Sequence, residues 1–490
     1  MNPTSPLCAP PPQTYAISTW PDTDLLYERL NALVKAPIRS IPATRMAGVL
    51  AYFETQCLRS KQLALEACRI IPGGVQHNLA FNYPFPLAIA AADGAHLWDV
   101  DGNRYIDFLQ AGGPTLLGSN YRPVREKIQE LLNGCGPVTG LFHEFELKLA
   151  ELVRTHMPGV EMLRMLGSGT EAMMAAIRLA RAYTGRKWII KIGGAYHGWS
   201  DQLVYGMRIP GTGRHEASGI PSASTRWTQE CFPNDLGALR RKLLLNRLRG
   251  GTAAVLVEPL GPESGTRPVH REFNRQVREL CNEFGALLVF DEVVTGFRIG
   301  LGGAQGYLGV RPDLTVLGKC LTGGYPMAGA VGGRKEIMAL LAGGIGASGN
   351  KRVFVGGTLS ANPLSCTAGY YSIRELERTN APVLAGRAGD RLCRGLRETI
   401  ERLRLPYVAY NQGSIVHLQT SGVLLMSARN PLKLLREAHQ RKRMMEEMGA
   451  AFTSHGIITL AGSRIYTSMA DTDAVIDEAL DRFETVLKLV

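Results

Sequence analysis

The sequence predicts a doubly wound α/β fold, and two observations lead to this prediction. Three short apolar runs, at 188–192, 253–257 and 286–290, have the composition of strands that are buried on both faces. The stretches 172–183 and 271–284 instead carry apolar residues at helical spacing. Strands that alternate with helices predict a parallel sheet covered by helices on both faces. In such a sheet, ligands bind beyond the carboxyl ends of the strands.

The rest of the chain predicts a smaller α+β domain made from two separate segments. Asp101-Gly102 lies between two strand patterns and indicates a hairpin, and 473–487 is the last predicted helix. Residues 1–28 are Pro-rich and lack Lys and Arg, so we expect a loosely docked tail there. The predicted organisation is an N-terminal extension, an N-terminal segment of the small domain, a large domain and a C-terminal small domain, at 1–55, 56–112, 113–365 and 366–490.

The composition is that of an ordinary globular protein with a basic surface. Of 490 residues, 45% are hydrophobic and 20% are charged, and the formal net charge is +12. Lys and Arg are scattered and accompany no nucleic-acid motif, so we expect neither a nucleic-acid nor a membrane partner. Nucleic-acid binding would rest on the charge alone, and salt-dependent binding to random DNA would test it. The nine Cys form no Cys-x-x-Cys pair, which argues against a disulfide framework or a zinc site and favours the cytoplasm. No apolar run is long enough to span a membrane.

Two glycine-rich segments have the features of a phosphate site. The segment 167–172 precedes a helical pattern, and such a turn presents backbone N–H groups and the positive end of the helix dipole to an anion. It also suits a plain helix start with a Thr cap, and this alternative stays open. The segment 356–363 is a second loop with N–H groups and a hydroxyl.

Three further residues follow predicted strands. Asp291 could hold a protonated pyridine nitrogen, or it could cap the next turn. Lys319 follows 314–317 in an apolar, glycine-rich setting, where poor hydration would favour the neutral, nucleophilic amine. It could also be a lysine whose ammonium reaches water at the sheet edge. Tyr196 could stack on a flat ring or simply cover the end of its strand.

Taken in this order, the motifs resemble those of the class III aminotransferases of fold type I, in particular the glutamate-1-semialdehyde aminomutase-like branch. The most specific stretch is 290–298, followed by 312–314 and 317–319, and the segments 99–103 and 168–172 also match. The resemblance runs from about residue 56 to the C-terminus. It implies a large domain with a doubly wound mixed sheet and a smaller α+β domain built from N- and C-terminal segments.

The resemblance also implies a cofactor, pyridoxal 5'-phosphate, which alternates with its pyridoxamine phosphate form. Lys319 would bind it as a Schiff base and then move a proton during catalysis. Asp291 would pair with the pyridine nitrogen, and Tyr196 and Val293 would lie on opposite faces of the ring.

The remaining cofactor contacts are also implied by the resemblance. Family members are homodimers with shared active sites, and Thr358 would reach the phosphate of the neighbouring subunit. His197 and Glu258 would lie near the cofactor in supporting roles. The phosphate would be held by residues of the first glycine-rich segment, namely Ser168, Gly169 and Thr170.

The residues expected to face the substrate depart from the aminomutase pattern. Ala80 stands where that branch carries an Arg for the substrate carboxylate, and Ser463 stands where it carries a Glu. We therefore expect an aminotransferase that acts on an unidentified amine or amino acid and a carbonyl compound. The alternatives are a 1,2-aminomutase, a racemase, or a regulator that binds the cofactor without turnover. Replacement carboxylate binders could be Arg208, Arg214, Arg298 and Arg464.

Overall fold

The computed structural model describes residues 14–213, 217–343, 352–427, 431–460 and 462–490. The described residues form two compact units. The large unit contains the described part of 123–383 together with residues 14, 15 and 427. The small unit contains 16–122, 384–426 and the described part of 431–490. The domain limits at residues 112 and 365 stay a prediction, while the compact units change at 122/123 and 383/384.

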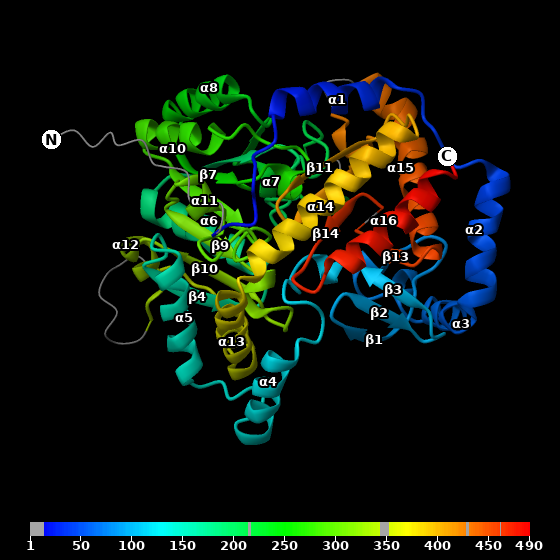
Figure 1. Cartoon of the computed structure of the whole chain (residues 1–490). Helices are drawn as coiled ribbons and strands as arrows, with labels where there is room; N and C mark the ends of the chain where they lie inside the picture. Colours follow the sequence, from blue (N-terminus) through cyan, green and yellow to red (C-terminus); the bar gives the residue numbers. More distant parts are fainter. Residues whose placement is uncertain (1–13, 214–216, 344–351, 428–430, 461) are drawn as a thin grey trace. The chain divides into compact units, whose positions relative to one another are not determined.

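A seven-stranded sheet forms the centre of the large unit (Figure 1). Its strand β10 runs antiparallel to both of its neighbours, whereas the other pairs for which a register is defined are parallel. The predicted doubly wound mixed sheet is therefore confirmed. In spatial order the strands are β4 (Met162–Leu166), β10 (Gly329–Gly333), β9 (Leu314–Leu317), β8 (Leu287–Glu292), β7 (Thr252–Val257), β5 (Trp188–Ile192) and β6 (Thr228–Cys231).

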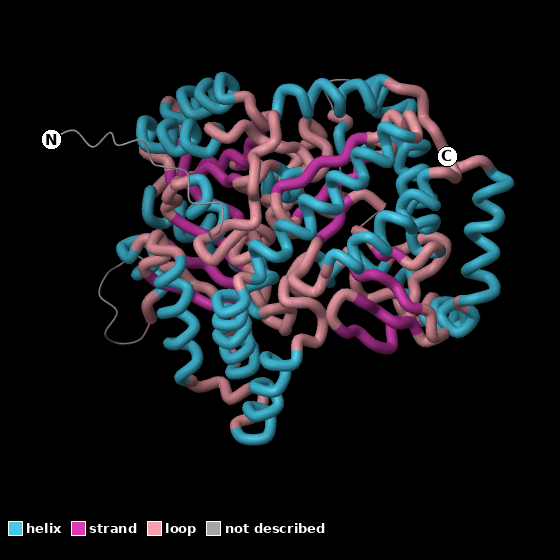
Figure 2. Tube along the Cα trace, viewed as in Figure 1, coloured by secondary structure: helices cyan, strands magenta, loops and turns pink. Residues whose placement is uncertain are grey.

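Helices pack on the sheet because its central strands β7, β8 and β9 are buried and mainly apolar. Leu287 and Val289 of β8 lie in one core cluster with the apolar face of α6 (Gly169–Thr184). Leu288 and Phe290 point to the opposite face, since side chains alternate along a strand, and α10 (Phe273–Phe284) packs against β7 and β8. Helices and strands alternate along this unit (Figure 2). Its other helices are α5 (Glu144–His156), α7 (Ser222–Thr225), α8 (Leu236–Arg247), α9 (Pro262–Gly265), α11 (Gly303–Leu308), α12 (Lys335–Met338) and α13 (Pro363–Thr379).

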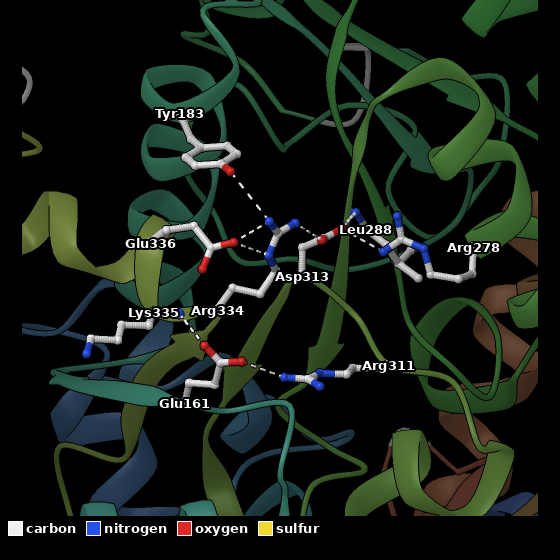
Figure 3. A network of polar contacts seen from close by, with 9 residues as sticks. All are labelled: Glu161, Tyr183, Arg278, Leu288, Arg311, Asp313, Arg334, Lys335 and Glu336. Atoms are coloured by element: carbon white, nitrogen blue, oxygen red, sulfur yellow. Dashed lines mark hydrogen bonds and ion pairs between the residues drawn. The ribbon is translucent and has the colours of Figure 1, made fainter.

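A polar network holds the amino end of β9 in place (Figure 3). The carboxylate of Asp313 accepts a hydrogen bond from the backbone N–H of Leu288 at 2.8 Å, which links β9 to β8. It also accepts hydrogen bonds from Arg278 of α10 at 2.6 Å and from Arg334, just before α12, at 2.8 Å. This network lies at the end of β9 opposite to Lys319, so it fixes the start of the strand whose other end leads to that lysine.

The small unit contains two sheets, one of which combines N-terminal and C-terminal strands. β13 (Ile457–Ile458) pairs in parallel with β3 (Arg104–Asp107), which joins the C-terminal and N-terminal segments. The predicted hairpin forms between β2 (His96–Asp99) and β3. The first sheet is completed by β1 (Ile89–Asp93), and the second consists of β11 (Val408–Gln412), β12 (Ile415–Gln419) and β14 (Arg464–Tyr466).

The expectation of a loosely docked tail over 1–28 is wrong for the part that the structure describes. Ala16, Ile17 and Leu26 are buried, and Leu30 continues the same apolar face of α1 (Thr23–Lys35). The helical spacing of Leu26 and Leu30 lets both side chains join the core of the small unit. Its other helices are α2 (Ala43–Gln56), α3 (Leu58–Ala67), α15 (Pro431–Ser454) and α16 (Asp473–Leu487), while α4 (Arg122–Gly134) and α14 (Ala381–Arg402) cross the boundaries between the units.

Candidate active site

The predicted site residues of the large unit gather at one edge of its sheet. β5, β7, β8 and β9 are parallel, so their carboxyl ends point the same way. Tyr196 and His197 follow β5, Glu258 follows β7, Asp291 lies near the end of β8, and Lys319 comes two residues after β9. The strand order therefore brings together side chains that are far apart in the sequence.

His197 and Asp291 form a buried pair. The Nδ1 atom of His197 lies 2.7 Å from Oδ2 of Asp291, and the two residues are only 2% and 6% exposed. Burial lowers the pKa of His197, although the Asp291 charge opposes this shift, so we assign a neutral imidazole whose Nδ1–H donates to the carboxylate. The other carboxylate oxygen accepts from the backbone N–H of Val293 at 3.1 Å. The imidazole therefore fixes the orientation of the Asp291 carboxylate.

Glu258 connects the end of β7 to the loop that carries Tyr196. Its Oε1 accepts hydrogen bonds from the backbone N–H groups of Tyr196 and Glu263, both at 2.9 Å, and its Oε2 accepts one from Ser264. Burial first, and then the negative charge of Asp291, raise the pKa of Glu258 to about 8. The position of the Tyr196 backbone thus depends on a buried carboxyl group.

The N-terminus of α6 forms a tight, glycine-rich turn, which we call the α6 cradle. Ser168 caps the helix by accepting a hydrogen bond from the N–H of Glu171 at 3.3 Å, and the positive end of the helix dipole lies here. A Cβ atom at Gly169 would lie 2.8 Å from Cγ2 of Val293, so only glycine permits this close approach. A Cβ atom at Gly198 would likewise lie 2.5 Å from Oγ1 of Thr170. The cradle therefore packs directly against the segments that follow β5 and β8.

Lys319 occupies an unusual backbone conformation. Its φ of 46° lies in the left-handed region, which non-glycine residues rarely adopt and which occurs often at functional sites. A Cβ atom at the preceding Gly318 would lie 3.0 Å from Cγ1 of Val293. Val293 consequently lies between the α6 cradle and the Gly318-Lys319 turn. Tyr196 is 43% exposed, which leaves its ring accessible.

Thr358 lies in a turn at the same end of α6. It is exposed, and a Cβ atom at its neighbour Gly357 would lie 3.6 Å from Oε2 of Glu171. Thus the second glycine-rich loop approaches the first within one chain.

The residues considered as carboxylate binders have different surroundings. Arg298 is fully buried beside Cys320, and Arg208 lies close enough to Tyr196 for its charge to oppose the raised pKa of that phenol, which burial causes. Arg464 is buried in the small unit, and Arg214 lies outside the described residues. In the small unit, Ala80 borders a cavity of about 330 Å³ whose walls are mainly apolar, among them Phe53, Leu79, Phe85 and Leu109.

One buried charge near the site was missed by the sequence analysis. Lys191 has no exposed surface, although it belongs to the apolar strand β5. A lysine inside the run 188–192 was the signal that could have revealed it. Within the described ranges, no group of three or more His, Cys, Asp or Glu could hold a metal ion. No helix in the described parts of the chain combines the length and apolar character needed to cross a membrane.

Comparison with known proteins identifies the family of this chain. The sequence pattern of the family "Aminotransferase class-III" matches residues 80–487. The chain is 42% identical, over 73% of its own length and 83% of the relative, to glutamate-1-semialdehyde 2,1-aminomutase 1 of Lachnoclostridium phytofermentans. It is 40% identical to the aminomutase of Chlorobium limicola, with 74% and 83% covered.

Solved structures share the fold. An omega-transaminase from Sphaerobacter thermophilus superposes with a TM-score of 0.77 at 29% identity, with 89% of this chain and 98% of that chain covered. A β-phenylalanine aminotransferase from Variovorax paradoxus gives a TM-score of 0.77 at 29% identity, with 90% and 96% covered. The chain therefore belongs to the class III aminotransferase family, whose members are pyridoxal-phosphate-dependent enzymes of fold type I.

Proposed function

We propose that this enzyme is an aminotransferase that moves an amino group between an amine or amino acid and a carbonyl compound, with Lys319 as the residue that carries the cofactor. The observation behind this proposal is the convergence of Lys319, the His197–Asp291 pair and the α6 cradle at one edge of the sheet.

The polar groups at this edge of the sheet suit the phosphate and the pyridine nitrogen of pyridoxal phosphate. The N-terminus of α6 with Ser168, Gly169 and Thr170 offers an anion site for the phosphate. Asp291 offers a buried carboxylate for a protonated pyridine nitrogen.

The ring of the cofactor would lie between two side chains, Val293 and Tyr196. When bound, the cofactor supplies an electron sink for the charge that develops at the substrate carbon. Lys319 would take the proton from the substrate carbon that bears the amino group and later return a proton as the general acid. Asp291 would keep the pyridine nitrogen protonated, and His197 and Glu258 would hold Asp291 and Tyr196 in position.

A 1,2-aminomutase is the second candidate, because two relatives at 42% and 40% identity carry that name. Ala80 and Ser463 favour the aminotransferase, since the Arg and the Glu that the aminomutase branch carries at these two places are absent. Single-turnover reactions with a panel of amino compounds separate the two. An aminotransferase would bleach the cofactor band and release one carbonyl product per site without a second substrate. An aminomutase would return only an isomer of the substrate.

Replacement of the lysine tests the central assignment. Lys319→Ala should lower kcat by ~10³-fold or more, because both cofactor attachment and proton transfer depend on its amine. The exposed Lys335 serves as a matched control, since Lys335→Ala should leave kcat unchanged. Both variants should melt as cooperatively as the wild type. A Lys319→Ala enzyme with substantial turnover would remove Lys319 from this role.

We further propose a cytoplasmic homodimer in which Thr358 contacts the cofactor phosphate of the neighbouring subunit. Thr358 is exposed, and so are large apolar residues of the same unit, with Leu141 at 78%, Phe142 at 77% and Leu359 at 45%. Exposed apolar surface of this kind suits a protein interface. Sedimentation should give twice the mass of the chain, and Phe142→Asp should yield monomers with weaker cofactor binding. Fractionation of cells that express a tagged chain would test the location.

A further inference from the structure

Lys191 is a fully buried lysine on β5, which lies between β7 and the edge strand β6 of the large unit's sheet. It lies on β5 between Ile190 and Ile192, and none of its surface is exposed. A buried ammonium is costly unless hydrogen bonds replace its lost hydration. Its Nζ donates to the carbonyl oxygen of Ala195 at 2.8 Å and to that of Leu203 at 3.3 Å. The lysine therefore reaches past the end of its own strand to hold the chain that follows.

These two carbonyl groups lie at either end of the loop that carries Tyr196 and His197. Ala195 directly precedes Tyr196, and both Ala195 and Leu203 are fully buried, so their carbonyl groups need a donor. The loop contains Gly194 at φ 89° and Gly198 at φ 90°, which place few conformational restraints on the chain. Backbone hydrogen bonds, such as that from Gly193 to Cys231 at 2.7 Å, hold the start of the loop, and side-chain hydrogen bonds hold the part around Tyr196 and His197.

Two further hydrogen bonds attach this loop to residues of the proposed site. The N–H of Tyr196 donates to Glu258, and the imidazole of His197 donates to Asp291. From its own strand, the loop is held by Lys191 and by the backbone N–H of Ala195, which donates to the carbonyl oxygen of Ile192 at 3.2 Å. We propose that Lys191 is a positioning residue, which holds the loop 193–203 so that the Tyr196 ring and the His197 imidazole meet the cofactor. This inference rests on the proposed function of the same site.

The test compares kcat per bound cofactor in Lys191→Met and Lys187→Met holoenzymes. Methionine keeps the length of the side chain but removes the donor, and Lys187 is an exposed lysine at the start of the same strand segment. Displacing catalytic groups by a fraction of an ångström to 1 Å lowers rates by up to ~10²-fold. We expect Lys191→Met to lower kcat by about 10- to 100-fold, and Lys187→Met to leave it unchanged.

A double-mutant cycle separates positioning from a general effect on folding. Because part of the effect of Lys191 would pass through the Tyr196 ring, Lys191→Met should lower kcat by a smaller factor in the Tyr196→Ala background than in the wild type. If the fold-losses in kcat caused by Lys191→Met and Tyr196→Ala simply multiplied in the double variant, the proposal would be overturned. A Lys191→Met enzyme with the kcat of the wild type would also overturn it. Normalising to bound cofactor removes any unfolded fraction from the comparison.

A conservative variant keeps the proposal testable if Lys191→Met folds poorly. Lys191→Arg retains a cation with several donors, and we expect it to recover most of the lost kcat. An Arg variant as slow as the Met variant would contradict the role of the hydrogen bonds to Ala195 and Leu203. A wild-type protein that shows no cofactor absorption band would instead refute the proposed function itself, which separates the two failures.

Discussion

The imidazole Nδ1 of His197 lies 2.7 Å from Oδ2 of Asp291, and this hydrogen bond joins the loop after β5 to the end of β8. Both groups are buried, and burial lowers the pKa of the imidazole. A neutral histidine orients the carboxylate without cancelling its charge. The negative charge of Asp291 then remains available to pair with a protonated group of a ligand.

Two substitutions of His197 should have different effects. His197→Ala leaves a buried carboxylate oxygen without its donor, which should lower the free energy of unfolding of the apoprotein by about 1–3 kcal/mol. We also expect a kcat at least ~10-fold lower, because Asp291 loses its orientation. His197→Asn places an amide N–H near the position of Nδ1. It should retain most of the free energy of unfolding and most of kcat. Urea denaturation and steady-state kinetics measure them, and equal losses in Ala and Asn would argue against the hydrogen bond.

Asp291→Asn should slow the chemical step far more than it weakens substrate binding. The charge that Asp291 stabilises develops mainly after the proton leaves, so kcat should fall by about 10²–10³-fold while KM changes little. Asp313→Asn is the matched control. It breaks the network with Arg278 and Arg334 at the other end of β9 (Figure 3), and should lower thermal stability with little change in kcat. If Asp291→Asn behaved like Asp313→Asn, Asp291 would have only a structural role.

The sequence predicted which residues end the strands, but not which of them touch. The apolar runs 188–192, 253–257 and 286–290 place Tyr196, Glu258 and Asp291 near the same sheet edge. The His197–Asp291 hydrogen bond joins residues that are 94 positions apart. To predict this contact, one must know the strand order β8-β7-β5. This order depends on tertiary packing and not on local periodicity.

Buried polar contacts were the least predictable part of the molecule. Lys191 looked like one polar residue in an apolar strand, and only the folded loop supplies the carbonyl groups that satisfy it. The prolines near the N-terminus likewise suggested a loose segment, whereas the apolar spacing of Leu26 and Leu30 carried the stronger information. The Pro-rich composition characterises the N-terminal segment as a whole, whereas its burial depends on a few apolar positions.

Glu258 should make the stability of the apoprotein depend on pH. Its pKa is raised from 4.5 to about 8, so the native state holds a proton that the unfolded state has released across that range. Its contribution is therefore fully present below pH 4.5 and is lost as the pH rises through 8. The expected slope is at most about 1.4 kcal/mol per pH unit.

Glu258→Gln removes this titration, and the difference between variant and wild type should change across the same pH range. The pKa of Asp107 in the small unit is also raised, to about 6, by burial, but Asp107 is present in both proteins and cancels in the difference. Urea unfolding at a series of pH values gives the comparison. A difference that stays constant with pH would show that Glu258 is ionised in the native protein.

Tyr15 should be an integral part of the large unit, because its ring fills a slot lined by glycines. A Cβ atom at Gly300 would lie 2.5 Å from Cδ1 of Tyr15, and the ring meets that of Tyr307 edge-on at 5.6 Å. Tyr15→Ala should lower the free energy of unfolding by about 2 kcal/mol, below the loss for a fully buried aromatic residue because Tyr15 is only half-buried.

The neighbouring Gly306 provides a test of this contact that does not depend on the size of that loss. A Cβ atom at Gly306 would lie 2.4 Å from the Tyr15 hydroxyl oxygen, and Gly306 has no left-handed φ that would itself exclude alanine. Gly306→Ala should therefore destabilise the wild-type protein by about 1–3 kcal/mol through overpacking. In the Tyr15→Ala background, the same substitution should be nearly neutral, since the clashing atoms are gone. Thermal melts of the four proteins measure this coupling, and strictly additive effects would mean that Tyr15 does not occupy the slot.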